Sequence, residues 1–319
     1  MLFEKQILDS YKNQMHTRCD DTETVFYYSH EDFAGLHRHP FPFPASAGHT
    51  LQGYLYAYDS PKSDRLIVFD HGFGGGHRAY MKEIELLCRH GYRVLAYDHT
   101  GCMESGGDTP GGMAHSLCDL NDCLCAVKAD AHLSSLSISV MGHSWGGFAA
   151  LNISPLHPDV SHVVVLSGFV SVEELIKGFF PGLLRGFRKP VMKLERASNP
   201  VYVNANAIES LKNSTTKALL IYSKDDALCN RHHFDLLKSA HAKRPNTRFM
   251  LLSGKGHNPN YTTGAVARLR EFTSARAKLL RKPNLTDREK AAFVASFDWN
   301  AMTAQDESVW SAIFSHLDS

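Results

Sequence analysis

The chain has 319 residues, with 34 basic and 33 acidic side chains and a formal net charge of +1. Hydrophobic residues make up 43% and charged residues 21%, a composition typical of a globular protein, which excludes disorder on a large scale. There is no long basic run that could follow a phosphate backbone, so nucleic acid is not an expected partner.

The amino-terminal residues lack the apolar core of a signal peptide. Charged side chains, among them Glu4, Lys5 and Asp9, interrupt this stretch. No later run approaches the roughly 20 apolar residues of a membrane span. We therefore expect a cytoplasmic protein without a membrane span.

The 7 cysteines and 19 histidines do not indicate a metal centre. Cys118, Cys123 and Cys125 fall in one predicted helix and are expected to be buried free thiols rather than a disulfide framework. Zinc is the alternative, and the pairs His37 with His39 and His232 with His233 are its candidate ligands. None of these forms a Cys/His set at a recognised spacing, so we expect neither a metal nor a cofactor.

The first predicted elements are a short amphipathic helix within residues 1–20 and an extended stretch at 40–44, where three prolines exclude a helix. Strand-like and helix-like segments then take turns. The predicted strands are 51–58, 65–70, 92–97, 135–141 and 161–167, and the predicted helices are 77–90, 112–130 and 145–156. This alternation predicts βαβ units in an α/β fold with a mostly parallel central sheet flanked by helices.

Residues 168–214 break the alternation, because phenylalanines and leucines lie among basic residues without a strong strand. This segment is predicted to be a small helical lid. The alternation then resumes with strands at 217–222 and 247–252 and helices at 231–241 and from about 260. We divide the chain into a lead-in (1–45), an α/β core (46–167 and 215–281), a helical cap (168–214) and a helical carboxy-terminal extension (282–319).

The strongest chemical signal is Gly142-His-Ser144-Trp-Gly146, at the junction of a predicted strand and a predicted helix. A nucleophile on such a tight turn needs glycines two positions to either side, because a side chain there would strike the neighbouring strand or helix. Ser144 is therefore the candidate nucleophile. The alternative is a glycine-rich turn with an incidental serine.

Two later loops supply the partners that a serine nucleophile needs. Asp225 and Asp226 follow the strand at 217–222, and His257 follows the strand at 247–252. A serine hydroxyl is a weak nucleophile near neutral pH, so a base must take its proton and a carboxylate must hold that base in the correct tautomer. The order Ser, Asp, His along the chain is the one that such a turn requires.

The run His71-Gly72-Phe73-Gly-Gly-Gly76 follows the predicted strand at 65–70. A phosphate-binding loop is the alternative, but the run has no Gly-Lys-Ser/Thr ending and no G-x-G-x-x-G pattern. An oxyanion hole instead needs backbone amides close to the nucleophile, each worth about 3 kcal/mol.

Together these motifs resemble the α/β-hydrolase superfamily, over about residues 50–275. Within it they are similar to the branch of serine aminopeptidases and monoacylglycerol lipases. The resemblance implies an α/β-hydrolase fold, Asp226 rather than Asp225 as the triad acid, and an oxyanion hole made by the backbone amides of Phe73 and Trp145.

The chain departs from that family at Tyr97-Asp98-His99-Thr-Gly-Cys-Met-Glu-Ser105, where an arginine and a second glycine are missing. Asp98 and Ser105 are expected to hold this loop together near the active site rather than to react. His99 is expected to be a hydrogen-bonded structural residue.

These observations predict a serine hydrolase that cleaves a small-molecule carboxylic ester through Ser144, His257 and Asp226 and an acyl-enzyme. A serine aminopeptidase or a thioesterase would use the same triad. The aminopeptidase remains an alternative, because a free amino terminus needs acidic partners and the predicted lid contains Glu173, Glu174 and Glu195. A non-catalytic binding protein with the same fold is the alternative from another class.

Overall fold

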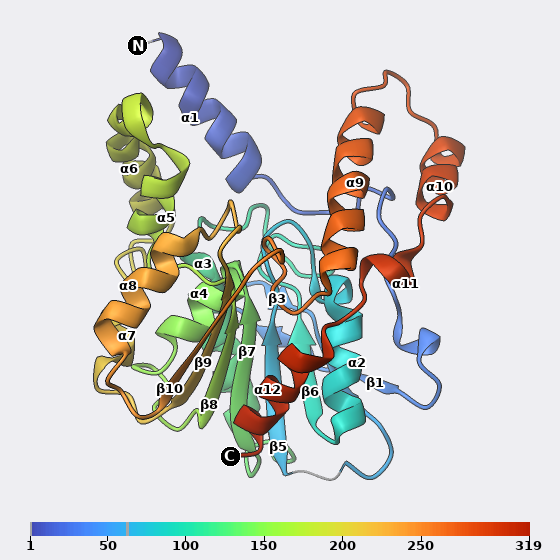
Figure 1. Ribbon diagram of the computed structural model, residues 1–319, viewed down its shortest axis with the longest axis vertical. Helices are drawn as coiled ribbons and strands as arrows, with labels where there is room; N and C mark the ends of the chain where they lie inside the picture. Colours follow the sequence, from blue (N-terminus) through green and yellow to red (C-terminus); the bar gives the residue numbers. More distant parts are fainter. Residues whose placement is uncertain (1, 62–63) are drawn as a thin grey trace.

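Eight strands form the central sheet, in the spatial order β1-β4-β6-β5-β7-β8-β9-β10 (Figure 1). The computed structural model describes residues 2–61 and 64–319. The strands are β1 (His37–Pro40), β4 (Gly53–Ala57), β5 (Arg65–Asp70), β6 (Arg93–Tyr97), β7 (Ser137–His143), β8 (His162–Leu166), β9 (Lys217–Ser223) and β10 (Thr247–Leu252), with a separate antiparallel pair of β2 (Phe43–Pro44) and β3 (Thr50–Leu51).

Every neighbouring pair from β6 to β10 is parallel, whereas β4 runs antiparallel to both β1 and β6. Parallel neighbours require a crossover between them, which the intervening helices provide. The predicted α/β class with a mostly parallel sheet is confirmed.

The helices are α1 (Leu2–Met15), α2 (Met81–His90), α3 (His115–Ala129), α4 (Trp145–Asn152), α5 (Val172–Phe179), α6 (Arg188–Ser198), α7 (Ala207–Lys212), α8 (Arg231–His241), α9 (Thr263–Leu279), α10 (Asp287–Ala295), α11 (Trp299–Met302) and α12 (Glu307–Leu317). The helix predicted to begin at residue 112 begins at His115. The reason is that Gly111 and Gly112 have φ angles of 71° and 88°, which a right-handed helix does not accept.

Helices cover both faces of the sheet. In β5, Leu66 and Val68 pack into one apolar cluster with α3, α4 and α8, while Ile67 and Phe69 pack into a second cluster with α2 and α12. Burial on both faces explains why the central strands are continuous apolar runs rather than alternating ones.

Helices α5, α6 and α7 lie within the predicted cap segment, and α1 packs beside α6 (Figure 1). The hydroxyl of Tyr11 on α1 donates a 2.8 Å hydrogen bond to Glu195 on α6. The amino-terminal helix therefore packs on the segment that is predicted to form the cap.

The carboxy-terminal segment packs on the sheet and on α9. Trp310 of α12 is 3% exposed in the second cluster, and Trp299 lies edge-on to Phe272 with ring centroids 4.9 Å apart. Across residues 2–61 and 64–319, no helix has both the length and the apolar character needed to cross a membrane.

Candidate active site

Ser144 lies between the last residue of β7 and the first residue of α4. Its φ of 55° and ψ of −106° form a conformation that costs a non-glycine residue about 1–3 kcal/mol. A Cβ added to Gly142 would lie 2.3 Å from the carbonyl oxygen of Gly146, and one added to Gly146 would lie 2.1 Å from that of Asp70. The two glycines thus permit the turn that presents the serine at the carboxyl edge of the sheet, where open α/β sheets bind ligands.

His257 and Asp226 are joined by a 2.8 Å hydrogen bond between Nδ1 and Oδ2. The other oxygen of Asp226 accepts the amides of Leu228 at 2.8 Å and Cys229 at 3.1 Å. Burial raises the pKa of Asp226, but the hydrogen bond and charge of His257 outweigh burial, and the net pKa lies below the ordinary value. Asp226 is therefore a carboxylate that binds Nδ1–H of His257 and leaves Nε2 as the basic nitrogen.

The neighbouring carboxylate, Asp225, binds the backbone of the loop that carries His257. It accepts the amide of Gly254 at 2.8 Å and that of Gly256 at 3.2 Å, and it also pairs with Arg270 at 2.9 Å. Asp225 therefore contacts the loop and α9, whereas Asp226 contacts the imidazole ring of His257.

Phe73 and Trp145 line the same cavity as Ser144. Trp145 is the first residue of α4, so its amide has no acceptor inside the helix. The next amide, that of Gly146, donates to the carbonyl oxygen of His71 over 3.1 Å. This bond joins the turn at Ser144 to the loop that carries Phe73, and both predicted oxyanion residues lie beside the serine.

A cavity of about 160 Å³ lies over Ser144 and His257. Most of its lining is apolar and comes from segments far apart in the chain: Met15, Phe73, Met113, Phe169, Leu175, Phe179, Leu228 and Cys229. Sequence reasoning missed Met15, because the amphipathic pattern of α1 predicts that the helix packs but not which surface it packs on.

Tyr80 and His143 connect the loop that carries Phe73 to the loop that carries His257. Nε2 of His143 lies 2.8 Å from the carbonyl oxygen of His257, so it must carry the ring proton and donate. Nδ1 then accepts from the hydroxyl of Tyr80 at 2.7 Å, and that hydroxyl accepts the amide of Gly72 at 3.0 Å. Burial, together with the His257 charge, lowers the pKa of His143 to about 3, so this direction of donation holds at neutral pH.

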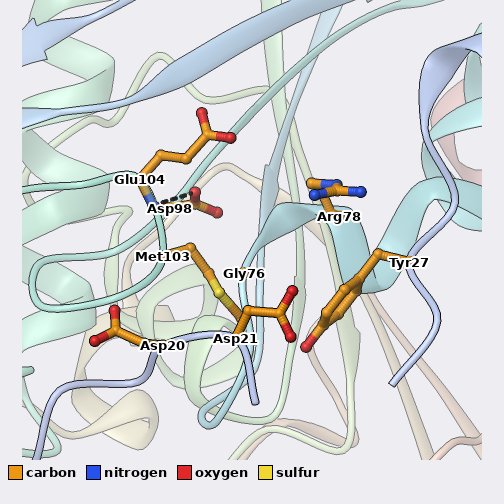
Figure 2. A pocket seen from close by; sticks show the side chains of 8 residues that line it. All are labelled: Asp20, Asp21, Tyr27, Gly76, Arg78, Asp98, Met103 and Glu104. Carbon is orange, nitrogen blue, oxygen red and sulfur yellow. Dashed lines mark hydrogen bonds between the residues drawn. The ribbon is translucent and has the colours of Figure 1, made fainter. Parts of the chain in front are cut away.

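Asp98 and Ser105 hold the loop after β6. Oδ1 of Asp98 accepts the backbone amide and Nδ1–H of His77, both at 2.8 Å. Its Oδ2 accepts the amide of Glu104 at 3.2 Å, the bond drawn in Figure 2. The Ser105 hydroxyl donates to the carbonyl oxygen of Asp98. Asp98 lines a second cavity of about 180 Å³, separate from the one over Ser144.

One histidine of each pair considered as zinc ligands binds a carboxylate instead. Nε2 of His37 lies 3.0 Å from Asp59, and Nε2 of His232 lies 2.9 Å from Glu174. In the part of the chain that the structure describes, no three His, Cys, Asp or Glu side chains are grouped as metal ligands would be.

A family model for the alpha/beta hydrolase fold matches residues 65–214. The "Putative carbamate hydrolase RutD" of Rhizobium rhizogenes is 26% identical over 156 residues, which cover 48% of this chain and 54% of the relative. The "Uncharacterized protein YqkD" of Bacillus subtilis is 29% identical over 158 residues, covering 49% and 48%. The chain thus spans about half the length of these curated relatives.

Solved structures share the fold across most of the chain. An esterase of Pyrococcus furiosus superimposes with a TM-score of 0.60 at 20% identity, covering 82% of this chain and 97% of the esterase. An acetyl xylan esterase from Paenibacillus sp. R4 gives a TM-score of 0.56 at 16% identity, covering 84% and 99%. The branch within the family stays a prediction. The sheet, the family model over residues 65–214 and these structures agree that the chain has the alpha/beta hydrolase fold.

Proposed function

We propose that the chain is a serine hydrolase that cleaves carboxylic esters. The observation that carries this proposal is one cavity in which Ser144, on its strained turn, lies with His257, whose Nδ1 is bonded to the buried carboxylate of Asp226. This arrangement matches the requirements of a nucleophile, a general base and a residue that orients the base.

In the proposed reaction, Nε2 of His257 takes the hydroxyl proton as Ser144 Oγ bonds to the ester carbonyl carbon. The amides of Phe73 and Trp145 donate to the oxygen that becomes negative. This addition gives a tetrahedral intermediate. Its collapse breaks the bond to the alcohol, which receives the proton from His257. Water then attacks the acyl-enzyme by the same route and releases the acid.

The cavity lining supports a small, uncharged acyl group. Apart from His143 and His257, the ionisable side chains among the described lining residues are Tyr80 and Cys229, and burial raises the pKa of each well above its ordinary value, so both are neutral at neutral pH. Leu175 and Phe179 of α5 contribute to this lining, which supports our assignment of residues 168–214 as a cap.

The carboxylates that an aminopeptidase would need are engaged elsewhere. Glu195 is fully buried and accepts from Tyr11, from His16 and from the amide of Met113. Glu174 pairs with Lys177 and with a histidine of α8, and Glu173 pairs with the same lysine. None of the three lines the cavity, so an ester is preferred over a peptide with a free amino terminus.

The test compares p-nitrophenyl esters from acetyl to palmitoyl with an acyl thioester, an aminoacyl p-nitroanilide and a carbamate. Ser144→Ala is expected to lose about a million-fold in kcat, as in other serine hydrolases. Ser154→Ala is the matched control, because its hydroxyl bonds the carbonyl oxygen of Ser210 and does not line the cavity. Faster turnover of another substrate class would replace the ester. No hydrolysis and no labelling of Ser144 by a fluorophosphonate would favour a binding protein.

A further inference from the structure

His99 is an imidazole enclosed between two carboxylates beneath the active site. Its Nε2 is hydrogen-bonded to Oδ1 of Asp70, and its Nδ1 lies 3.0 Å from Oδ2 of Asp119. The side chains of all three residues are at most 1% exposed. The proposed reaction uses none of them, and a buried ionic group of this kind is costly unless it is fully paired.

The geometry requires a proton in each of the two bonds. A charged imidazole supplies both protons from its two N–H groups. A neutral imidazole has one N–H, so a protonated carboxyl group would have to donate in the other bond. The three residues together hold two protons in both cases. Asp119 also accepts the amide of Thr100 at 2.8 Å and its hydroxyl at 2.7 Å, which marks it as ionised. Burial lowers the pKa of His99, but the charge of Asp70 and the hydrogen bonds to both carboxylates raise it to about 10.

The backbone of His99 reaches the loop that carries Phe73 through His71. The amide of His99 donates to Nε2 of His71 at 3.0 Å, so the proton of that ring is on Nδ1, which donates to the carbonyl oxygen of Gly72 at 2.8 Å. This carbonyl belongs to the same planar trans peptide as the amide of Phe73, and the two groups point in opposite directions. Fixing the carbonyl therefore fixes the direction of the oxyanion donor.

The ring of His99 also reaches the nucleophile turn. It packs on the indole of Trp145 with ring centroids 4.5 Å apart, and the indole N–H donates to the carbonyl oxygen of Met113 at 2.8 Å. A buried cation this close to an indole is attracted to its π system. Because Ser144 directly precedes Trp145 and is strained, its conformation depends on such surrounding contacts.

We propose that His99, charged and clamped between Asp70 and Asp119, is a positioning residue that holds the two oxyanion amides, those of Phe73 and Trp145, in line with Ser144. This inference rests on the proposed hydrolase function. It goes beyond a packing role, because the cation is what lets two carboxylates approach the same buried ring.

The test is a charge-balance cycle with His99→Gln, Asp119→Asn and the double variant. In His99→Gln the two carboxylates face a neutral group, and kcat is expected to fall about 100-fold with KM nearly unchanged, as for a displaced catalytic group. The double variant removes one of the two negative charges and so restores the net charge of the wild-type cluster, and its kcat should recover to within about 10-fold of the wild type. His157→Gln is the control, a buried histidine that binds Asn121 and Lys128.

A readout that does not need hydrolysis keeps the two proposals apart. In ¹⁵N-labelled wild-type protein, both ring N–H protons of His99 should be observed at neutral pH. The His99→Gln variant should shift the amide resonances of Phe73 and Trp145. Unmoved amides, or equal kcat in wild type and His99→Gln, would overturn the positioning role. A double variant no better than His99→Gln would also overturn it. Absent hydrolysis by the wild type would refute only the proposed function.

Discussion

Nδ1 of His257 lies 2.8 Å from Oδ2 of Asp226, although 31 positions separate the two residues in the chain. Parallel pairing of β9 and β10 brings them together, since both strands end at the same edge of the sheet. The adjacent carboxylate of Asp225 faces the loop amides instead.

Replacing Asp226 should therefore affect catalysis far more than replacing Asp225. Asp226→Asn is expected to lower kcat by about 10⁴-fold, because an amide favours the wrong tautomer of His257. Asp225→Asn should cost less than about 10-fold, since it weakens only the loop contacts. Steady-state kinetics of both variants on one ester decide the matter, and equal losses would contradict the assignment.

Tyr80→Phe should lower kcat by about 10-fold with little change in KM. The variant leaves the amide of Gly72 and Nδ1 of His143 without the hydroxyl that joins them, and each unpaired buried group costs about 1–3 kcal/mol. Tyr58→Phe removes a hydroxyl that bonds Glu85 at 3.1 Å and is the matched control. The connection would be dismissed if both variants matched the wild type.

Met15→Ala should shift the preferred ester towards longer acyl chains, because Met15 lines the cavity from α1. Leu8→Ala on the same helix packs against the core without lining the cavity and should leave the preference unchanged. The measurement is kcat/KM across the p-nitrophenyl series. An unchanged optimum in Met15→Ala would show that α1 does not bound the substrate.

Lowering the pH should protonate Asp98 and so remove its stabilising contribution to the loop after β6. Although burial raises its pKa, the hydrogen bond and charge of His77 lower it from 3.8 to about 2. A carboxylate whose pKa is lower in the folded than in the unfolded state stabilises the fold at pH values above its unfolded-state pKa. This contribution is lost as the pH falls through its folded-state pKa. The free energy of unfolding by urea should differ by about 2 kcal/mol between wild type and Asp98→Asn at pH 6, and the difference should shrink below about pH 4. Asp59→Asn, an exposed control, should show no such trend.

The sequence by itself determined the parallel α/β sheet and the position of the candidate nucleophile. Both depend on local patterns: alternating apolar segments, and glycines at 142 and 146 whose contacts lie within a few residues of Ser144 or on the adjacent strand. The order of Ser144, Asp226 and His257 at strand ends also follows from the chain, because parallel strands end at one edge.

Only the tertiary structure decided what surrounds these residues. Met15 reaches the cavity because α1 packs on α6, through a bond from Tyr11 to Glu195 that spans 184 positions. The pattern around His99 predicted a hydrogen-bonded residue, but not that Asp70 and Asp119 would enclose it from two other elements. Periodicity records which face of an element is buried, and the partner on that face is set by how the elements pack.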